Sequence, residues 1–373
     1  MASDRAVRWA GTMSGHRPDS SGIRQAHAGD DAIRVDPGRL LDRFQREEAE
    51  ESELASGATR SGAWSGRRFR EEEPDDLRTC FEQDRDRILH SAAFRRLAGK
   101  TQVFIFPADH QRTRLTHALE VAQVATSIAR ACRLNVALTE AIALGHDCGH
   151  GPGGHASEDA FSVFVPGFDH AVWGADVTAA PLNLCVETLD GIRNHSWSRP
   201  APSTPEGQVV GLADRVAYCA HDLEDAVAAG VVEASDLPAV VVERCGPTRS
   251  AQLHTFITDI CSTVARTGLV GMSDPMGDAL AALRAFNHER IYLRPASVLQ
   301  GATVVGLLRA LVEHFASGAA GDLPDEFRAG DDPLLSAVAY VDGMTDRFAC
   351  EAAVSLLGWD ADRLPRGQDV VVS

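Results

Sequence analysis

The segment from Ala141 to His150 holds the residues most able to do chemistry. It reads Ala-Ile-Ala-Leu-Gly-His-Asp-Cys-Gly-His, so the adjacent pair His146 and Asp147 follows a run of apolar residues. Burying an imidazole and a carboxylate costs free energy unless both groups find partners. Histidine is also concentrated nearby, because six of the 14 histidines fall between residues 110 and 170. This pattern indicates a site that binds a metal ion or moves protons.

His117 lies on a second apolar stripe. It shares one helix face with Val121 and Ile128, at spacings of four and eleven residues, which places it at the inward-facing start of a helix. An inward histidine is more often a satisfied core residue than a metal ligand, and the pair at 146–147 is what favours ligation. Because adjacent helical residues diverge by about 100°, that pair can share an ion only if the ion lies off the helix end.

The segment 209–225 carries a third set of polar residues at helical spacing. These residues are Asp214, Tyr218, His221, Asp222 and Asp225. A charged stripe is usually the wet face of an amphipathic helix, and we keep this interpretation for Asp225. For Asp214 and Tyr218 the sequence favours a functional interpretation, because the N-terminal half of this helix is otherwise apolar.

Two imidazoles and two carboxylates together form a mixed nitrogen and oxygen donor set. Such a set suits Mn²⁺, Fe²⁺ or Zn²⁺, and less specifically Mg²⁺. Because coordination positions are left for water and substrate, we expect a catalytic rather than a structural site. A metal ion there can polarise a phosphoryl oxygen and generate hydroxide near neutral pH.

Composition limits the class of protein. A chain of 373 residues with 44% hydrophobic content can bury a large core. Its net charge of −17 opposes nonspecific binding to nucleic acid or to anionic lipid. Nucleic acid stays an allowed partner, but this charge does not indicate it. Eight scattered cysteines without a CxxC pair predict free thiols in a reducing cytoplasm. The apolar runs are too short to span a bilayer and no signal peptide is evident, so we expect a soluble protein without a membrane partner.

The pattern beyond Pro74 is helical almost continuously, and no strand-like alternation competes with it. We therefore predict an all-α fold. Residues 1–42 are expected to form a mobile tail, and residues 43–76 a charged, extended arm on the surface or across a subunit boundary. The core is expected at 77–230, with additional C-terminal helices at 231–373 completing the same domain.

The order of these motifs resembles a known family. His117, the pair His146 and Asp147, and then Asp214 resemble the HD phosphohydrolase superfamily. The surrounding runs resemble its deoxynucleoside triphosphate triphosphohydrolase branch, the dGTPase-like proteins. Those runs are residues 78–104, 109–117 and 149–158, with weaker similarity at 182–195 and 286–292. The resemblance covers residues 43–325 and implies an HD-domain fold, a homo-oligomer, and hydrolysis of a deoxynucleoside triphosphate to deoxynucleoside and inorganic triphosphate.

The resemblance also implies ligands and catalytic groups. The implied ligands of a divalent ion (Mn²⁺, Mg²⁺ or Fe²⁺) are His117, His146, Asp147 and Asp214. His155 would be the catalytic histidine, and Glu158, one turn later on the same helix face, would orient it.

Substrate contacts are implied in the same way. Arg114 would contact the α-phosphate, while Lys100 and Arg112 would reach the outer phosphates. The residues implied near the deoxyribose are Gln102, Tyr218 and Asp222. Lys100 is the only lysine in the chain, which is a weak sign of a position that needs a compact point charge.

The chain departs from the family pattern after His170. Relatives typically continue with Asn-x-Gln-Ser-Leu-Arg, whereas residues 171–176 here are Ala-Val-Trp-Gly-Ala-Asp, and the loop 150–155 lacks the Pro-Phe bulk of relatives. Two alternatives therefore stay open. One is an HD phosphohydrolase acting on another phosphoester, such as a nucleoside monophosphate. The other is a nucleotide-binding regulator with little turnover.

Overall fold

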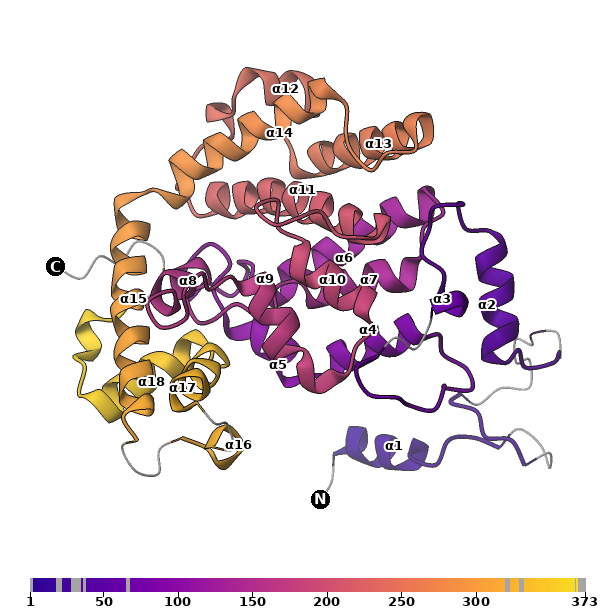
Figure 1. Ribbon diagram of the computed structural model, residues 1–373, viewed down its shortest axis with the longest axis horizontal. Coiled ribbons are helices and arrows are strands. Elements are labelled where there is room, and N and C mark those ends of the chain that lie inside the picture. The colour runs from indigo at the N-terminus through magenta and orange to yellow at the C-terminus, as the bar shows by residue number, and fades with distance from the viewer. Residues whose placement is uncertain are drawn as a thin grey trace. The chain divides into compact units, whose positions relative to one another are not determined.

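The computed structural model describes residues 3–17, 22–27, 35, 38–64, 68–318, 323–328, 332–365 and 367. The chain divides into two compact units, Met1–Leu41 and Asp42–Ser373. The described residues are helical with connecting loops, and their extended pairing is confined to isolated bridges (Figure 1). The predicted all-α class is confirmed.

The first unit contains helix α1 (Asp4–Thr12), where the sequence predicts an irregular tail. Ser3 caps this helix by accepting a hydrogen bond from the backbone N–H of Ala6. An isolated bridge then joins His16 to Gln25. The mobility expected for residues 1–42 stays a prediction, and residues 28–34, on which it also falls, lie outside the described part of the chain.

The segment expected to be an extended arm begins instead as helix α2 (Arg43–Ser52). Asp42 and Gln45 form a reciprocal capping box at its start, which satisfies backbone N–H groups that a helix end leaves free. Its charged residues pair within the helix, as Arg43 does with Glu47 at 3.1 Å. The prediction of an extended arm is therefore wrong for this part. A role of residues 43–76 in a homo-oligomer stays a prediction.

The end of the arm is anchored by Arg68 rather than solvated. After the short helix α3 (Ser61–Trp64), the Arg68 guanidinium lies 2.6 Å from the Asp84 carboxylate in helix α4 (Cys80–His90). Both side chains are buried. A buried charge is tolerated only when it is paired and hydrogen-bonded, so this pair fixes the arm to the core.

The main apolar core of the second unit surrounds helix α7 (Val136–Gly145). The helices packed against it are α4, α6 (Arg114–Ala131), α10 (Val186–Asn194) and α11 (Pro205–Ala228). Val121, Ile128 and Ile142 are fully buried there, as their spacing predicts. Burial of such side chains stabilises the fold by about 25 cal/mol per Å² of apolar surface. This packing also holds together α6, α7 and α11, the three helices that carry or precede the polar motifs.

A second apolar cluster joins the C-terminal helices to helix α8 (His155–Phe161). Helix α15 (Pro295–Ala316) packs against α8, α17 (Pro333–Asp342) and α18 (Asp346–Leu357). Phe161 and Leu308 are fully buried in this cluster. The remaining helices are α5 (Ala92–Arg96), α9 (His170–Trp173), α12 (Ala239–Cys245), α13 (Arg249–Thr267), α14 (Asp274–Asn287) and α16 (Asp325–Arg328).

Helix α15 is long and apolar enough to cross a membrane by length and composition, whereas the apolar runs of the sequence were expected to be too short for this. Its buried stripe includes Leu307 and Leu311, which pack in the second cluster, while Glu313 is exposed. A core helix passes the same test of length and composition, and this packing accounts for the apolar stripe. All eight cysteines are free, and the cytoplasmic location stays a prediction.

Candidate functional site

The four predicted metal ligands come together from three helices. His117 lies in the first turn of α6, Asp214 lies within α11, and His146 and Asp147 follow the end of α7. His117 Nε2 is 3.1 Å from Asp214 Oδ1 and 3.8 Å from Asp147 Oδ2. His146 Nε2 is 3.5 Å from Asp147 Oδ1 and 3.7 Å from Asp214 Oδ1. The arrangement off the end of α7 is the one that the sequence predicts.

The donor atoms of this cluster fit a cation. His146 is fully buried, and its Nδ1–H donates to the Ala143 carbonyl at 2.7 Å, which leaves Nε2 with the lone pair. That Nε2 has no hydrogen-bond partner, and it faces the carboxylates of Asp147 and Asp214. A lone pair that faces two anions is unfavourable unless a proton or a metal ion lies between them. The cluster can therefore hold a divalent ion through His117, His146, Asp147 and Asp214.

The pKa of His146 shows how strongly this cluster attracts positive charge. Burial alone would lower that pKa, but the carboxylates of Asp147 and Asp214 outweigh burial and raise it to about 9. Burial would likewise raise the pKa of Asp147, but Arg114 and His146 hold it well below its ordinary value. A metal ion bound by His146 would take the place of a proton there, because an imidazole ligates in its neutral form.

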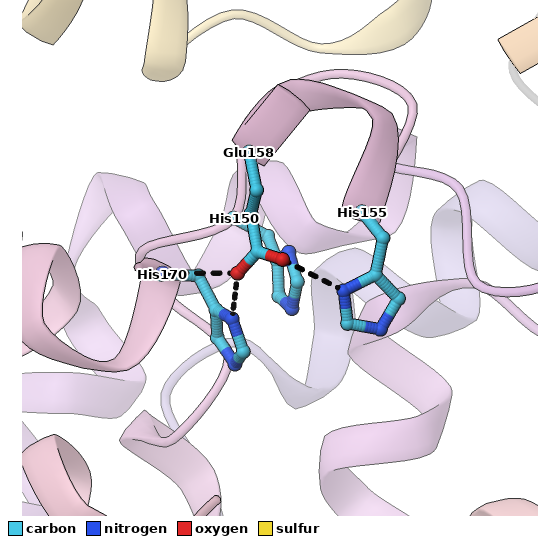
Figure 2. Close-up of side chains that lie close together, drawn as sticks. All are labelled: His150, His155, Glu158 and His170. Carbon is cyan, nitrogen blue, oxygen red and sulfur yellow. Dashed lines mark hydrogen bonds and ion pairs between the residues drawn. The ribbon is translucent and has the colours of Figure 1, made fainter. Parts of the chain in front are cut away.

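A second group of side chains lies beside this cluster, and Figure 2 shows how it is organised around Glu158. Glu158 Oε2 is 3.1 Å from His155 Nδ1, and Oε1 accepts from both the backbone N–H and Nδ1 of His170. The His150 ring stacks on that of His170, with centroids 3.7 Å apart. Burial would raise the pKa of Glu158, but hydrogen bonds from His155 and His170 hold it below its ordinary value. Glu158 therefore stays ionised and orients two imidazoles.

Three histidines of the site, His150, His170 and His195, have no role in the prediction from sequence, and His150 Nε2 lies 3.3 Å from Asp147 Oδ1. His170 Nε2 lies 3.7 Å from Asp147 Oδ1, and His195 Nε2 lies 3.3 Å from His170 Nε2. His195 is buried, and burial together with the charge of His146 lowers its pKa to about 4. The sequence signals were that His150 and His170 fall in the histidine-rich stretch 110–170 and that His195 ends the family-like run 182–195.

Three residues of the first group and three of the second line a cavity of about 500 Å³: His117, Asp147, Asp214, His150, His155 and His170. Three buried polar atoms of other lining residues have no hydrogen-bond partner: Arg114 Nε, Asp222 Oδ1 and Gln102 Oε1. Leaving a buried polar atom unpaired costs about 1–3 kcal/mol. A cavity that leaves such atoms free is suited to a polar ligand, and all three residues are among those that the sequence predicts near a substrate.

The part of α11 beyond Asp214, with α14 and the π-helical turn His288–Tyr292, also lines the cavity. Tyr292 donates its hydroxyl proton to Asp222 Oδ2 at 2.6 Å, and the Arg284 Nε–H donates to the Tyr218 hydroxyl at 3.0 Å. Burial raises the pKa of Asp222 to about 6, and the Tyr292 hydrogen bond offsets part of that effect. Tyr292 ends the weaker family-like run 286–292, whereas Arg284 was not predicted, because it lies far along the chain from the metal motifs.

Arg112 does not reach the cavity, so the predicted contact with outer phosphates is not supported. Its guanidinium lies 2.9 Å from Glu120, 2.6 Å from Glu224 and 2.5 Å from Asp225. Asp225 is 5% exposed and also accepts the backbone N–H of Arg112. The interpretation of Asp225 as a solvated residue is therefore wrong, because it is the buried partner of this arginine.

Lys100 is also directed away from the cavity, since it is not among the lining residues that the structure describes. The residue is 3% exposed, and its ammonium donates to the backbone carbonyls of His150 and Asp342. Contact with an outer phosphate is therefore not supported. Arg114 does line the cavity, where it pairs with Asp147 at 2.5 Å.

The departure from the family pattern at residues 171–176 lies outside the cavity. No residue of this segment, all of which the structure describes, is part of the lining. Trp173 is 8% exposed and packs in the second apolar cluster, with its ring 5.1 Å from that of Phe168. Gly149 approaches the following turn so closely that a Cβ would lie 2.2 Å from the His170 carbonyl oxygen. Residues 171–176 therefore pack near the loop that follows Asp147 and do not line the cavity.

This helical fold and its histidine and aspartate cluster define an HD-domain phosphohydrolase. Residues 114–219 match the HD domain, and residues 270–354 match the phosphohydrolase-associated domain. The matched HD segment begins at Arg114 and contains all four predicted metal ligands.

Comparison with known proteins then gives the family. The chain is 42% identical to the deoxyguanosinetriphosphate triphosphohydrolase-like protein of Caldanaerobacter subterraneus subsp. tengcongensis, over 81% of this chain and 92% of that protein. It is 41% identical to a protein of the same name from Clostridium perfringens, over 75% of this chain and 87% of that protein. A hypothetical protein from Aquifex aeolicus, of solved structure, aligns with a TM-score of 0.48 and 15% identity, over 75% of this chain and 70% of that one. The chain belongs to the family of deoxyguanosinetriphosphate triphosphohydrolase-like proteins.

Proposed function

We propose that the protein hydrolyses a deoxynucleoside triphosphate to deoxynucleoside and inorganic triphosphate. The observation that carries the proposal is that one cavity holds a metal-ligand cluster, an unpaired arginine N–H and an unpaired carboxylate oxygen. The names of the relatives point to a deoxyguanosine triphosphate-like substrate. When bound, Mn²⁺, Mg²⁺ or Fe²⁺ would polarise a phosphoryl oxygen and lower the pKa of a water molecule. The residues that would hold the ion are His117, His146, Asp147 and Asp214.

Arginine side chains would bind the phosphates. Arg114 is fixed beside the ligand cluster by its pair with Asp147, and its Nε–H is left free for an oxygen of the α-phosphate. Arg215 and Arg284 also line the cavity and would meet the charge of the outer phosphates, in place of Lys100 and Arg112. Charge-assisted hydrogen bonds of this kind are about twice as strong as neutral ones.

His155 would move the proton that the leaving 5′-oxygen needs. Its side chain is 75% exposed and lines the cavity, so a substrate can reach it. The hydrogen bond between Nδ1 and Glu158 leaves Nε2 as the atom that faces the reacting group. When the His155 ring is protonated, Glu158 would stabilise its positive charge. The Nε2–H of His155 would then donate its proton to the 5′-oxygen as the bond between that oxygen and the α-phosphorus breaks.

The wall formed by α11 and the π-helical turn would bind the deoxyribose. Asp222 Oδ1 is unpaired and would accept the 3′-hydroxyl, with Gln102 as a second polar contact. Tyr218 lies on α11 between Asp214 and Asp222, one turn from each. A tyrosine packed against the sugar would leave little room for a 2′-hydroxyl.

An assay of the purified protein against all four deoxynucleoside triphosphates with Mn²⁺ tests this proposal, with triphosphate separated from orthophosphate. Release of triphosphate supports it. Orthophosphate from a nucleoside monophosphate would favour the other HD phosphohydrolase. Tight binding of nucleotide without any product would favour the regulator, although the segment that motivates it lies outside the cavity.

A further inference from the structure

The C-terminal helices reach the loop between Asp147 and His155 through one buried carboxylate. Asp346 is the first residue of α18 and is 6% exposed. Its Oδ1 accepts the backbone N–H of Gly153 at 2.8 Å, and its Oδ2 accepts the hydroxyl proton of Thr101 at 2.6 Å. A single side chain therefore ties two segments of the site to the second apolar cluster.

Lys100 makes a second connection at the other end of the same loop. Its ammonium donates to the His150 carbonyl and, at 2.9 Å, to the carbonyl of Asp342, the last residue of α17. An ammonium is a compact donor that can lie between two carbonyls, whereas a guanidinium is a wide planar fork. This geometry suits a lysine, and the only lysine among the 36 basic residues of the chain is found at this position.

The turn held by Asp346 leads directly into the proposed proton donor. Gly153 and Gly154 have φ angles of +74° and +62°, which residues with a side chain rarely adopt. His155 follows as the first residue of α8. A Cβ on Gly154 would lie 2.9 Å from an Arg114 nitrogen, so the turn also packs against the arginine beside the metal ligands. A shift of this turn would move His155 relative to Arg114.

We propose that Asp346 is a positioning residue for the reaction, acting through Gly153 to hold His155 in place. Asp346 is not among the described residues that line the cavity, so it acts without touching the substrate. Its carboxylate holds the turn by one hydrogen bond, from Gly153, and is itself held by Thr101, while the Lys100 ammonium holds the opposite end of the loop. The phosphohydrolase-associated region, residues 270–354, thereby sets the geometry of the HD site. Only the kinetic test of the role of Asp346 rests on the proposed function.

The experiment compares three variants of the full chain: Asp346→Ala, Asp346→Asn and Asp274→Ala. Asp274 is the matched control, because it also begins a helix (α14) but is exposed and has no contact with the loop. A misplacement of about 1 Å can cost about 100-fold in rate, so Asp346→Ala should lower kcat by about 10- to 100-fold. KM and bound Mn²⁺ should change by less than about threefold, since the binding wall and the metal ligands keep their places. Asp346→Asn retains an oxygen for Gly153, and the Thr101 hydroxyl can accept from its amide, so kcat should stay within about threefold of the natural protein.

Hydrogen exchange supplies a readout that needs no substrate. In Asp346→Ala the amides of residues 149–156 should exchange faster than in the natural protein, while those of α6 and α7 stay unchanged. Unchanged kcat and unchanged exchange in Asp346→Ala, or an equal loss in Asp274→Ala, would overturn the proposal. If Asp346→Ala does not fold, Asp346→Ser takes its place, because its shorter side chain also removes the carboxylate that binds Gly153, and unaltered loop exchange in that variant overturns the proposal instead. Absence of triphosphate release by the natural protein would refute the proposed function, whereas the exchange experiment would still decide whether Asp346 holds the loop.

Discussion

Replacing Asp222 by Asn should stabilise the free protein while it weakens the proposed activity. Asp222 is 3% exposed, its Oδ1 has no partner, and burial raises its pKa from 3.8 to about 6. At about pH 7.5 the folded protein therefore carries a buried charge that the unfolded chain holds in water. Two pKa units correspond to about 3 kcal/mol at 1.36 kcal/mol per unit. We expect Asp222→Asn to raise the free energy of unfolding by about 1–3 kcal/mol, because water in the cavity relieves part of the cost.

The pH dependence gives the sign of this effect. Between about pH 4 and pH 6 the folded protein binds the Asp222 proton more tightly than the unfolded chain does, so stability falls as the pH rises. The amide of Asn does not titrate. The stability advantage of Asp222→Asn should therefore be greatest above about pH 6 and should disappear near pH 4.

Urea unfolding of both proteins at about pH 7.5 and about pH 4.5 measures this difference. Asp225→Asn is a matched control one turn along α11, and it should destabilise the protein because Asp225 is the buried partner of Arg112. In the triphosphate assay Asp222→Asn should lower kcat/KM about tenfold, since an amide oxygen accepts a hydroxyl less strongly than a carboxylate. The reasoning would be refuted if Asp222→Asn were less stable than the natural protein at about pH 7.5. It would also be refuted if the difference in the free energy of unfolding between the two proteins were the same at both pH values.

Three further substitutions test the assigned roles. His146→Ala should abolish turnover and lower bound Mn²⁺ measured by atomic absorption, because solvent cannot replace a ligand in the same geometry; full metal content would contradict the ligand assignment. His155→Ala should keep its metal and lose about 10²- to 10⁴-fold in kcat, and loss of metal instead would make His155 a ligand. Tyr218→Ala should narrow the ratio of dGTP to GTP hydrolysis by about ten- to a hundredfold, whereas Tyr218→Phe should keep it. An unchanged ratio in Tyr218→Ala would show that the sugar is read elsewhere, at Gln102 or Tyr292.

The sequence could predict the parts of the site that local pattern controls. Apolar residues at helical spacing place His117 inward on α6, and the end of an apolar helix places His146 and Asp147 beside it. The short spacing of His155 and Glu158 likewise predicts their hydrogen bond, which the structure shows at 3.1 Å. Such features need only the geometry of one helix or of one turn.

Partners that are distant along the chain could not be predicted in this way. Arg112 is positioned like a phosphate ligand in the sequence, but Asp225, 113 residues later, binds its guanidinium. Lys100 binds the carbonyl of Asp342, 242 residues later, and this contact has no sequence signature because a backbone carbonyl is the acceptor. The charged segment 43–76 has contacts of the same kind. Arg68 pairs with the buried Asp84, and no local sequence pattern predicts that pair.

The most direct test of the central claim is hydrolysis of dGTP with Mn²⁺ in ¹⁸O-labelled water, with both products analysed by mass spectrometry. Attack of water at the α-phosphorus with cleavage of the bond to the 5′-oxygen predicts one ¹⁸O atom in inorganic triphosphate and none in deoxyguanosine. Label in deoxyguanosine, or release of labelled orthophosphate or pyrophosphate in place of triphosphate, would contradict the account.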